Sequence, residues 1–170
     1  MDSSYCILEI IVGPMFSGKT TLLIEKFNLL KNTHNCLAIN YLHDNRYNEG
    51  NDKIISHNNE KIDCISIVDL NELFNNKDYN NKFNDADYIF INEAQFFGSL
   101  KTWILFILNH HYKNVVLCGL DLDFKKKKFG ELMDLFPYAT SITQLTGICY
   151  DCSNASLYSH RINKTKTKNQ

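Results

Sequence analysis

The amino-acid sequence predicts an α/β fold in which a mostly parallel sheet is flanked by helices. Apolar, strand-like runs alternate along the chain with stretches that have helical spacing. Several of these runs are apolar throughout, as expected for strands with helices on both faces of the sheet. The glycine-containing segment 13–20 follows the first strand-like run and opens the first helical stretch. These observations together predict a P-loop fold of the RecA-like kind.

The order of the elements follows from the hydrophobic pattern. Six runs rich in apolar and β-branched residues are expected to be strands: 5–12, 36–42, 62–67, 87–92, 114–119 and 140–145. Helices are expected between them at 19–32, 69–75, 98–111 and 130–136. The polar, asparagine-rich residues 43–61 predict a loop or small hairpin, and residues 75–84 predict a polar insertion or loop. The tail 163–170 consists of polar and charged residues and is expected to be mobile.

Length and composition indicate one ordinary globular domain. The chain has 170 residues, 44% of them hydrophobic, and a formal net charge of −1. That charge gives no reason to expect nucleic acid or a membrane surface as a partner. The sequence has no apolar run of bilayer-spanning length and no basic leader before its first apolar run, so we expect a cytoplasmic location. Four cysteines in strand-like runs are expected to be small buried hydrophobes: Cys6, Cys36, Cys64 and Cys118.

The segment after the first strand matches the phosphate-binding pattern G-x-x-x-x-G-K-[ST]. Its residues are Gly13, Pro14, Met15, Phe16, Ser17, Gly18, Lys19 and Thr20. A strand, a glycine loop and a helix in this order direct backbone N–H groups and a helix N-terminus at phosphate oxygens. Lys19 would reach the β- and γ-phosphates, and the Thr20 hydroxyl would bind Mg²⁺. The alternative, a chance match in an ordinary turn, is disfavoured by the flanking elements.

A second group of polar residues follows the strand expected at 87–92. Asn92 can offer an amide oxygen to Mg²⁺ but no charge, so its hold on the ion should be weaker than that of an aspartate. Glu93 is the expected general base, because a carboxylate there can accept the proton of an attacking hydroxyl. A solvated loop carboxylate is the alternative for Glu93. Gln95 is expected near the phosphates, or else at a helix start where it satisfies backbone groups.

Five ordered segments give the chain its resemblance to the thymidine kinases of the cellular and poxviral type. They lie in the order and at the spacing typical of that family, over residues 7–161: 13–20, 43–47 (His-Asp-Asn-Arg-Tyr), 92–97 (Asn-Glu-Ala-Gln-Phe-Phe), 119–130 and 145–152. The resemblance implies transfer of the γ-phosphate of ATP to the 5′-hydroxyl of thymidine, with Mg²⁺. It also implies a homotetramer, because members of the family commonly form tetramers.

The same resemblance implies roles for individual residues. Glu93 corresponds to the proton acceptor of the family. Residues expected to border the phosphates are Asp44, Asn45 and Arg46. Residues expected to bind the nucleoside are Met15, Phe124, Phe129 and Ser159. An aromatic face can stack on a base with roughly 1–3 kcal/mol, although an ordinary core position is the alternative for each phenylalanine.

The chain departs from the family pattern in two places. The first is Asn92, where the family usually has aspartate. The second is the pair Cys149 and Cys152, which would supply half of a tetrahedral zinc site, with only His160 nearby. The resemblance therefore implies a P-loop nucleoside kinase domain over 1–147. The rest, 148–170, would be a partial zinc and lid segment, a zinc-ribbon-like remnant with a disordered tail.

Three functions remain open from the sequence. The first is an active thymidine kinase. The second is a catalytically impaired nucleotide-binding remnant, suggested by Asn92 and by the absence of most of the lid loop that the family uses to cover thymidine. The third is a different P-loop enzyme that hydrolyses a nucleotide with water. For the zinc pair, ligands from outside this chain and two reduced surface thiols are the two alternatives.

Overall fold

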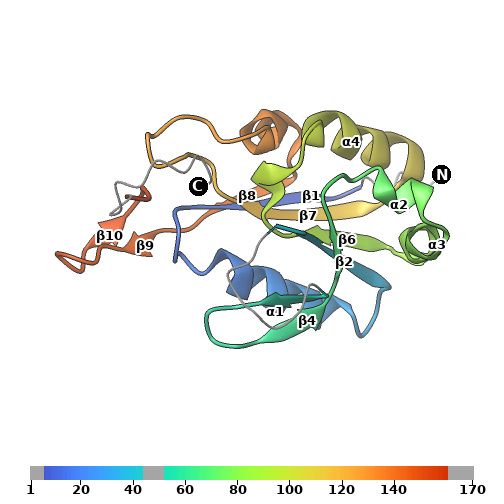
Figure 1. The fold of residues 1–170 in the computed structure, drawn as a ribbon, viewed down its shortest axis with the longest axis horizontal. Coiled ribbons are helices and arrows are strands. Elements are labelled where there is room, and N and C mark those ends of the chain that lie inside the picture. The colour runs from blue at the N-terminus through green and yellow to red at the C-terminus, as the bar shows by residue number, and fades with distance from the viewer. Residues whose placement is uncertain (1–5, 44–51, 161–170) are drawn as a thin grey trace.

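A six-stranded sheet forms the centre of the computed structural model, which describes residues 6–43 and 52–160 (Figure 1). Its strand order is β5-β2-β6-β7-β1-β8, and every neighbouring pair is parallel. The strands are β1 (Leu8–Val12), β2 (Cys36–Tyr41), β5 (Ile65–Ile67), β6 (Tyr88–Ile91), β7 (Asn114–Gly119) and β8 (Ser141–Gln144). The predicted α/β class with a mostly parallel sheet is therefore confirmed.

Two antiparallel hairpins complete the strands. One joins β3 (Lys53–Ile55) to β4 (Lys61–Asp63), and the other joins β9 (Gly147–Ile148) to β10 (Ala155–Ser156). The second hairpin projects at the left of Figure 1, away from the central sheet. The first confirms that the asparagine-rich region contains a small hairpin, although its second strand extends beyond the predicted range of 43–61.

Helices cover both faces of the sheet (Figure 1). Helix α1 (Lys19–Leu30) lies on one face together with the β3–β4 hairpin. The other face carries α2 (Glu72–Asn75), α3 (Lys77–Asp85), α4 (Leu100–Phe106), the π-helical turn η2 (Ile107–His111) and the 3₁₀ helix η3 (Leu132–Tyr138). A further 3₁₀ turn, η1 (Ala94–Phe96), follows β6. No helix in the described ranges is long and apolar enough to cross a membrane.

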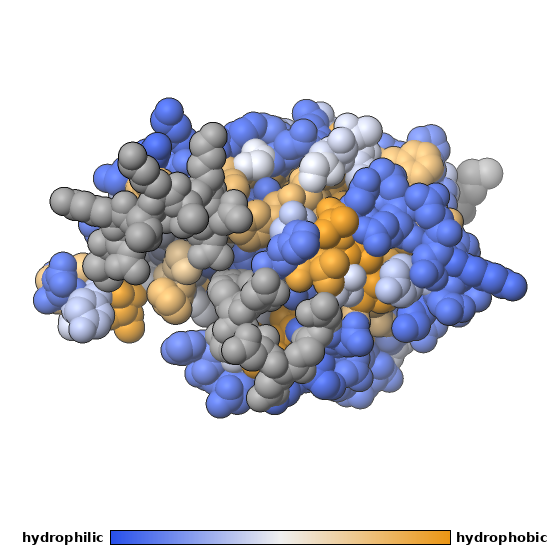
Figure 2. Space-filling model, in the orientation of Figure 1, coloured by the Kyte–Doolittle hydropathy of each residue, from blue (hydrophilic) through white to orange (hydrophobic). Residues whose placement is uncertain are grey.

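The hydrophobic core is divided by the sheet into two clusters. Ile10 and Ile89 belong to the cluster under α4, whereas Ile11 and Phe90 belong to the cluster under α1. Successive strand residues face opposite sides of a sheet, so strands buried on both faces must be apolar throughout. Outside this core the surface is mainly hydrophilic, with apolar side chains visible near the middle of the face in Figure 2.

Four expectations need correction. Residues 75–84 are not a loop, because 77–85 form helix α3. Its start is capped by the Asn76 side chain, which accepts hydrogen bonds from the amides of Asp78 and Tyr79. Phe83 is fully buried on this helix, so a cap and one apolar face outweigh the polar composition.

The run 62–67 was expected to be one strand, but it belongs to two. Residues 61–63 pair with β3, and 65–67 pair with β2 of the main sheet. Residues 130–136 were expected to be an α-helix, but 132–138 form a 3₁₀ helix that contains Pro137, whose missing N–H disfavours regular α-helix. Of the four cysteines expected to be buried, Cys118 is buried and the other three are partly buried.

Candidate active site

The predicted phosphate loop connects β1 to α1. Gly13 has φ 151°, and a Cβ atom there would lie 2.4 Å from the carbonyl oxygen of Leu145, so only glycine fits. Gly18 has φ 84° and precedes the first residue of α1 without a side chain that could cap it. The first amides of α1 are therefore open to an external anion, as the strand–loop–helix prediction requires.

Lys19 is buried within this loop, with 6% of its surface exposed. Its ammonium donates a 2.7 Å hydrogen bond to the carbonyl oxygen of Pro14. A buried lysine needs such a partner because an uncompensated ammonium is costly to desolvate. The lysine is thus held at the loop where phosphate oxygens would bind.

Asn92 directly follows β6 and faces the loop. Its side-chain oxygen lies 3.5 Å from the Thr20 hydroxyl and 3.5 Å from the Cys118 sulfur, and its amide nitrogen donates to Asn40 at 2.9 Å. Asn92 follows β6 and the phosphate loop follows β1, and strand β7 lies between these two strands. Asn92 and Thr20 therefore approach each other at the carboxyl edge of the sheet, although their strands are not neighbours. The Thr20 and Asn92 oxygens are ligands of the kind that Mg²⁺ takes.

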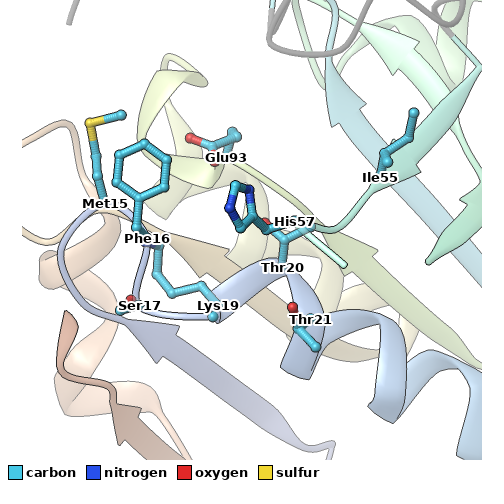
Figure 3. Close-up of a pocket in the computed structure, with 10 residues that line it drawn as sticks. Met15, Phe16, Ser17, Lys19, Thr20, Thr21, Ile55, His57 and Glu93 are labelled. Atoms are coloured by element: carbon cyan, nitrogen blue, oxygen red, sulfur yellow. The ribbon is translucent and has the colours of Figure 1, made fainter. Parts of the chain in front are cut away.

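Glu93 shares one pocket with the phosphate loop. The pocket is lined by Met15, Phe16, Ser17, Gly18, Lys19, Thr20, Thr21, Ile55, His57 and Glu93. Figure 3 shows the Phe16 ring, the His57 ring and the Glu93 carboxylate around it. Glu93 is 3% exposed and has φ 53°, a left-handed backbone conformation that is uncommon for glutamate and occurs at functional sites.

Gln95 makes two hydrogen bonds inside the protein. Its Nε2 donates to Glu93 Oε2 at 2.6 Å, and its Oε1 accepts from the Leu120 amide at 3.0 Å. The residue is 2% exposed and does not line the pocket of the phosphate loop. Its expected contact with the phosphates stays a prediction.

The residues expected to bind the nucleoside come from three segments. Phe129 is partly buried and packs edge-to-face on Phe96, with ring centroids 5.2 Å apart. Phe124 is partly buried beside the ammonium of Lys125, which lies 5.5 Å from its ring centroid. The Met15 amide donates a 2.8 Å hydrogen bond to the Ser159 hydroxyl.

This last contact brings the segment after β10 back to the phosphate loop. Lys126 also contacts the segment, with its ammonium 4.4 Å from the centroid of the Tyr158 ring. The structure therefore connects Met15 to Ser159 by a hydrogen bond and places the 120–130 segment in contact with Tyr158. The three residues expected at the phosphates, Asp44, Asn45 and Arg46, lie outside the described residues.

Sequence reasoning missed two residues near the loop. His57, from the turn of the β3–β4 hairpin, meets the Phe16 ring edge-to-face at 5.9 Å. Asn40, in β2, is 7% exposed and contacts Asn92. Neither belongs to a recognisable pattern, although a polar residue near the end of an otherwise apolar strand was a signal that could have indicated Asn40.

Cys149 and Cys152 lie in the turn of the β9–β10 hairpin. Hydrogen bonds from the backbone of Cys152 and Asp151, and from the Cys152 thiol, lower the pKa of the Cys149 thiol. The described part of the chain contains no cluster of three or more His, Cys, Asp or Glu residues placed to hold a metal. The pair thus offers two of the four ligands that zinc requires, and a zinc-ribbon-like remnant is not confirmed.

A glycine-containing loop at the edge of a parallel sheet, with a buried carboxylate in the same pocket, is consistent with an α/β protein of the P-loop type. Comparison with known proteins identifies the group within that class. The thymidine kinase family model matches residues 6–170, and the chain belongs to this family. Membership places it among the kinases, which are enzymes.

Relatives from plants, viruses and animals support the assignment. The chain is 36% identical to the thymidine kinase of Oryza sativa subsp. japonica over 164 residues, which cover 95% of this chain and 59% of that protein. It is 36% identical to the thymidine kinase of Yaba monkey tumor virus over 95% of this chain and 84% of the relative. The cytosolic thymidine kinase of Cricetulus griseus is 31% identical over 94% of this chain and 64% of the relative.

Proposed function

We propose that this chain transfers the γ-phosphate of ATP to the 5′-hydroxyl of thymidine, giving thymidine monophosphate for nucleotide salvage. The observation that carries the proposal is that Glu93, Lys19 and Thr20 line the same pocket. A phosphate-binding lysine and a carboxylate that can take a proton are the two groups that this reaction needs side by side.

The loop residues bind and orient the phosphates. The other backbone amides of 13–20 and the N-terminus of α1 face phosphate oxygens, since Pro14 has no N–H and the Met15 N–H donates to Ser159. Lys19 exchanges its hydrogen bond with Pro14 for one with the nucleotide. Thr20 and Asn92 would hold Mg²⁺, whose chemistry is to neutralise charge on the phosphates. Asp44, Asn45 and Arg46 complete the phosphate contacts in this proposal.

Glu93 handles the proton. The thymidine 5′-oxygen forms a bond to the γ-phosphorus, the bond to the β–γ bridging oxygen breaks, and ADP leaves. The hydroxyl proton moves to the Glu93 carboxylate. Burial of Glu93 beside the loop keeps it out of bulk water, which favours transfer to the sugar rather than to water.

The nucleoside would bind beside the 120–130 segment. Phe124 and Phe129 offer aromatic faces for the base. Met15 of the phosphate loop and Ser159 of the segment after β10 border it. Zinc at Cys149 and Cys152 would need ligands from elsewhere, and no step depends on it. A homotetramer and a cytoplasmic location stay predictions.

The test is an assay of radiolabelled thymidine with ATP and Mg²⁺. We expect labelled monophosphate from the wild-type chain and a loss of roughly 10²-fold or more in Glu93→Gln, which keeps the shape but removes the base. Lys19-dependent ATP binding without phosphorylation of any nucleoside would instead indicate an impaired remnant. ADP release that does not depend on thymidine would indicate a water-directed nucleotidase.

A further inference from the structure

We propose that Gln95 is a positioning residue that holds the Glu93 carboxylate at the reacting hydroxyl. This inference rests on the proposed function, because it takes Glu93 as the general base. In this role Gln95 acts on the reaction through Glu93. It fixes Glu93 to the backbone at the start of the 120–130 segment, which carries Phe124 and Phe129.

The two hydrogen bonds of Gln95 define its orientation. Its Nε2 group lies 2.6 Å from Glu93 Oε2, and its Oε1 atom accepts from the Leu120 amide at 3.0 Å. An amide flip would place Oε1 against the carboxylate and Nε2 against the Leu120 N–H, so only one orientation satisfies both neighbours. Because Gln95 is 2% exposed, water cannot easily replace either partner.

Two glycines make room for Gln95. A Cβ atom on Gly119 would lie 2.2 Å from Gln95 Oε1, and a Cβ atom on Gly130 would lie 2.2 Å from the Gln95 carbonyl oxygen. Gly130 also has φ 62°, whereas Gly119 has an ordinary backbone conformation, so the need for glycine at 119 is steric. The segment that begins and ends at these glycines thus closes tightly around one glutamine.

Glu93 needs such a support because its own backbone is unusual. It sits at φ 53°, directly between β6 and the short 3₁₀ turn η1. A strained position persists only where neighbouring contacts hold it. The hydrogen bond from Gln95 fixes the orientation of the Glu93 carboxylate. The hydrogen bond between Gln95 and the Leu120 amide fixes Gln95 relative to the segment expected to bind the nucleoside.

The first experiment compares Gln95→Met, which keeps the length of the side chain but loses both hydrogen bonds, with the wild type. We expect kcat to fall about tenfold or more, by analogy with other supporting residues, while the KM for thymidine changes much less.

Ile104→Val is the matched control for loss of core packing. Ile104 is fully buried in α4 and is not part of the pocket. This variant should lower thermal stability with kcat and the KM for thymidine unchanged. If Ile104→Val, at equal loss of melting temperature, reproduced the changes of Gln95→Met, a purely structural role would replace the positioning role.

Gly119→Ala is an independent way to disturb the hydrogen bonds of Gln95. Its new methyl group should push Gln95 Oε1 away and lower kcat as Gln95→Met does. In the double variant Gln95→Ala/Gly119→Ala the closest clash, with the glutamine side chain, is absent, whereas the contacts of the new methyl group with Leu132 Cδ2 at 3.0 Å and the Ala94 nitrogen at 3.3 Å remain. Gly119→Ala should therefore lower kcat less in the Gln95→Ala background than it does alone. Fully additive losses would overturn the proposal.

One measurement separates this inference from the proposed function. The side-chain Nε2 resonances of Gln95 should shift in Glu93→Gln, whether or not the protein phosphorylates thymidine. If wild-type protein gave no product but these resonances shifted, the proposed function would fail and the Gln95–Glu93 contact would stand. Unchanged resonances in Glu93→Gln would overturn the contact itself.

Discussion

The ammonium of Lys19 and the carbonyl oxygen of Pro14 lie 2.7 Å apart, so the phosphate loop binds its own lysine. This contact satisfies a buried charge and fixes the position of the lysine side chain at the loop expected to bind phosphate.

Lys19→Ala should weaken ATP binding and lower kcat by roughly 10²-fold, the loss typical when one group that stabilises transition-state charge is removed. Titration calorimetry with a non-hydrolysable ATP analogue and the thymidine assay would measure the two effects. Lys26→Ala is the matched control. Its partner is Glu9 at 2.7 Å, and both side chains are about 30% exposed, so its loss should cost roughly 0–1 kcal/mol of stability and little activity.

Asn92→Asp should strengthen the use of Mg²⁺. An aspartate adds a negative charge next to the Thr20 hydroxyl, and Mg²⁺ prefers carboxylates to amides. We expect the Mg²⁺ concentration for half-maximal activity to fall by about tenfold, corresponding to roughly 1.4 kcal/mol.

Asn40→Ala provides the comparison for this site. Asn40 accepts the amide hydrogen of Asn92 and so turns the Asn92 oxygen toward Thr20. Asn40→Ala alone should raise the Mg²⁺ concentration needed for half-maximal activity. It should have less effect when combined with Asn92→Asp, because either oxygen of the introduced carboxylate can then face the ion. Equal effects in both backgrounds would argue against this orientation.

Ser159→Ala should loosen the segment after β10. The hydroxyl accepts from the Met15 amide, and no other hydrogen bond of this amide is found within the described residues. We expect the Met15 amide to exchange its hydrogen faster, by roughly tenfold for each 1.4 kcal/mol lost. Hydrogen exchange followed by NMR would show this. Ser156→Ala, which removes a hydrogen bond to the Tyr158 carbonyl, is the nearby control and should leave Met15 unchanged.

Most of the fold and the centre of the site could be predicted from local patterns. Continuous apolar runs predicted the parallel strands, and one glycine pattern predicted the loop that holds Lys19. Helix α3 was missed because its asparagines suggested a loop, although Asn76 is also a strong helix cap. Asn40 and His57 were missed because their roles arise from contacts across 52 and 41 positions with Asn92 and Phe16, which no local pattern encodes.

Two cysteines whose pKa values shift in opposite directions give the last prediction. Hydrogen bonds within its turn lower the pKa of the Cys149 thiol, whereas burial raises the pKa of Cys64 to about 11. The thiolate is the reactive form, so near pH 7 iodoacetamide should modify Cys149 well before Cys64. The excess rate of Cys149 over a free thiol should shrink as pH rises above the ordinary thiol range, because a low-pKa thiolate is intrinsically less nucleophilic.

Mass spectrometry of digests, with a chelator present to remove bound metal, would follow both sites. Cys152→Ala removes one of the three hydrogen bonds to the Cys149 sulfur and keeps the two from the backbone. Its effect should therefore be a moderate slowing at neutral pH that disappears at alkaline pH, where Cys149 is ionised in either protein. A Cys149 rate that does not depend on Cys152 would show that the turn does not hold the two sulfurs together, and the pair would then be a poor starting point for any metal site.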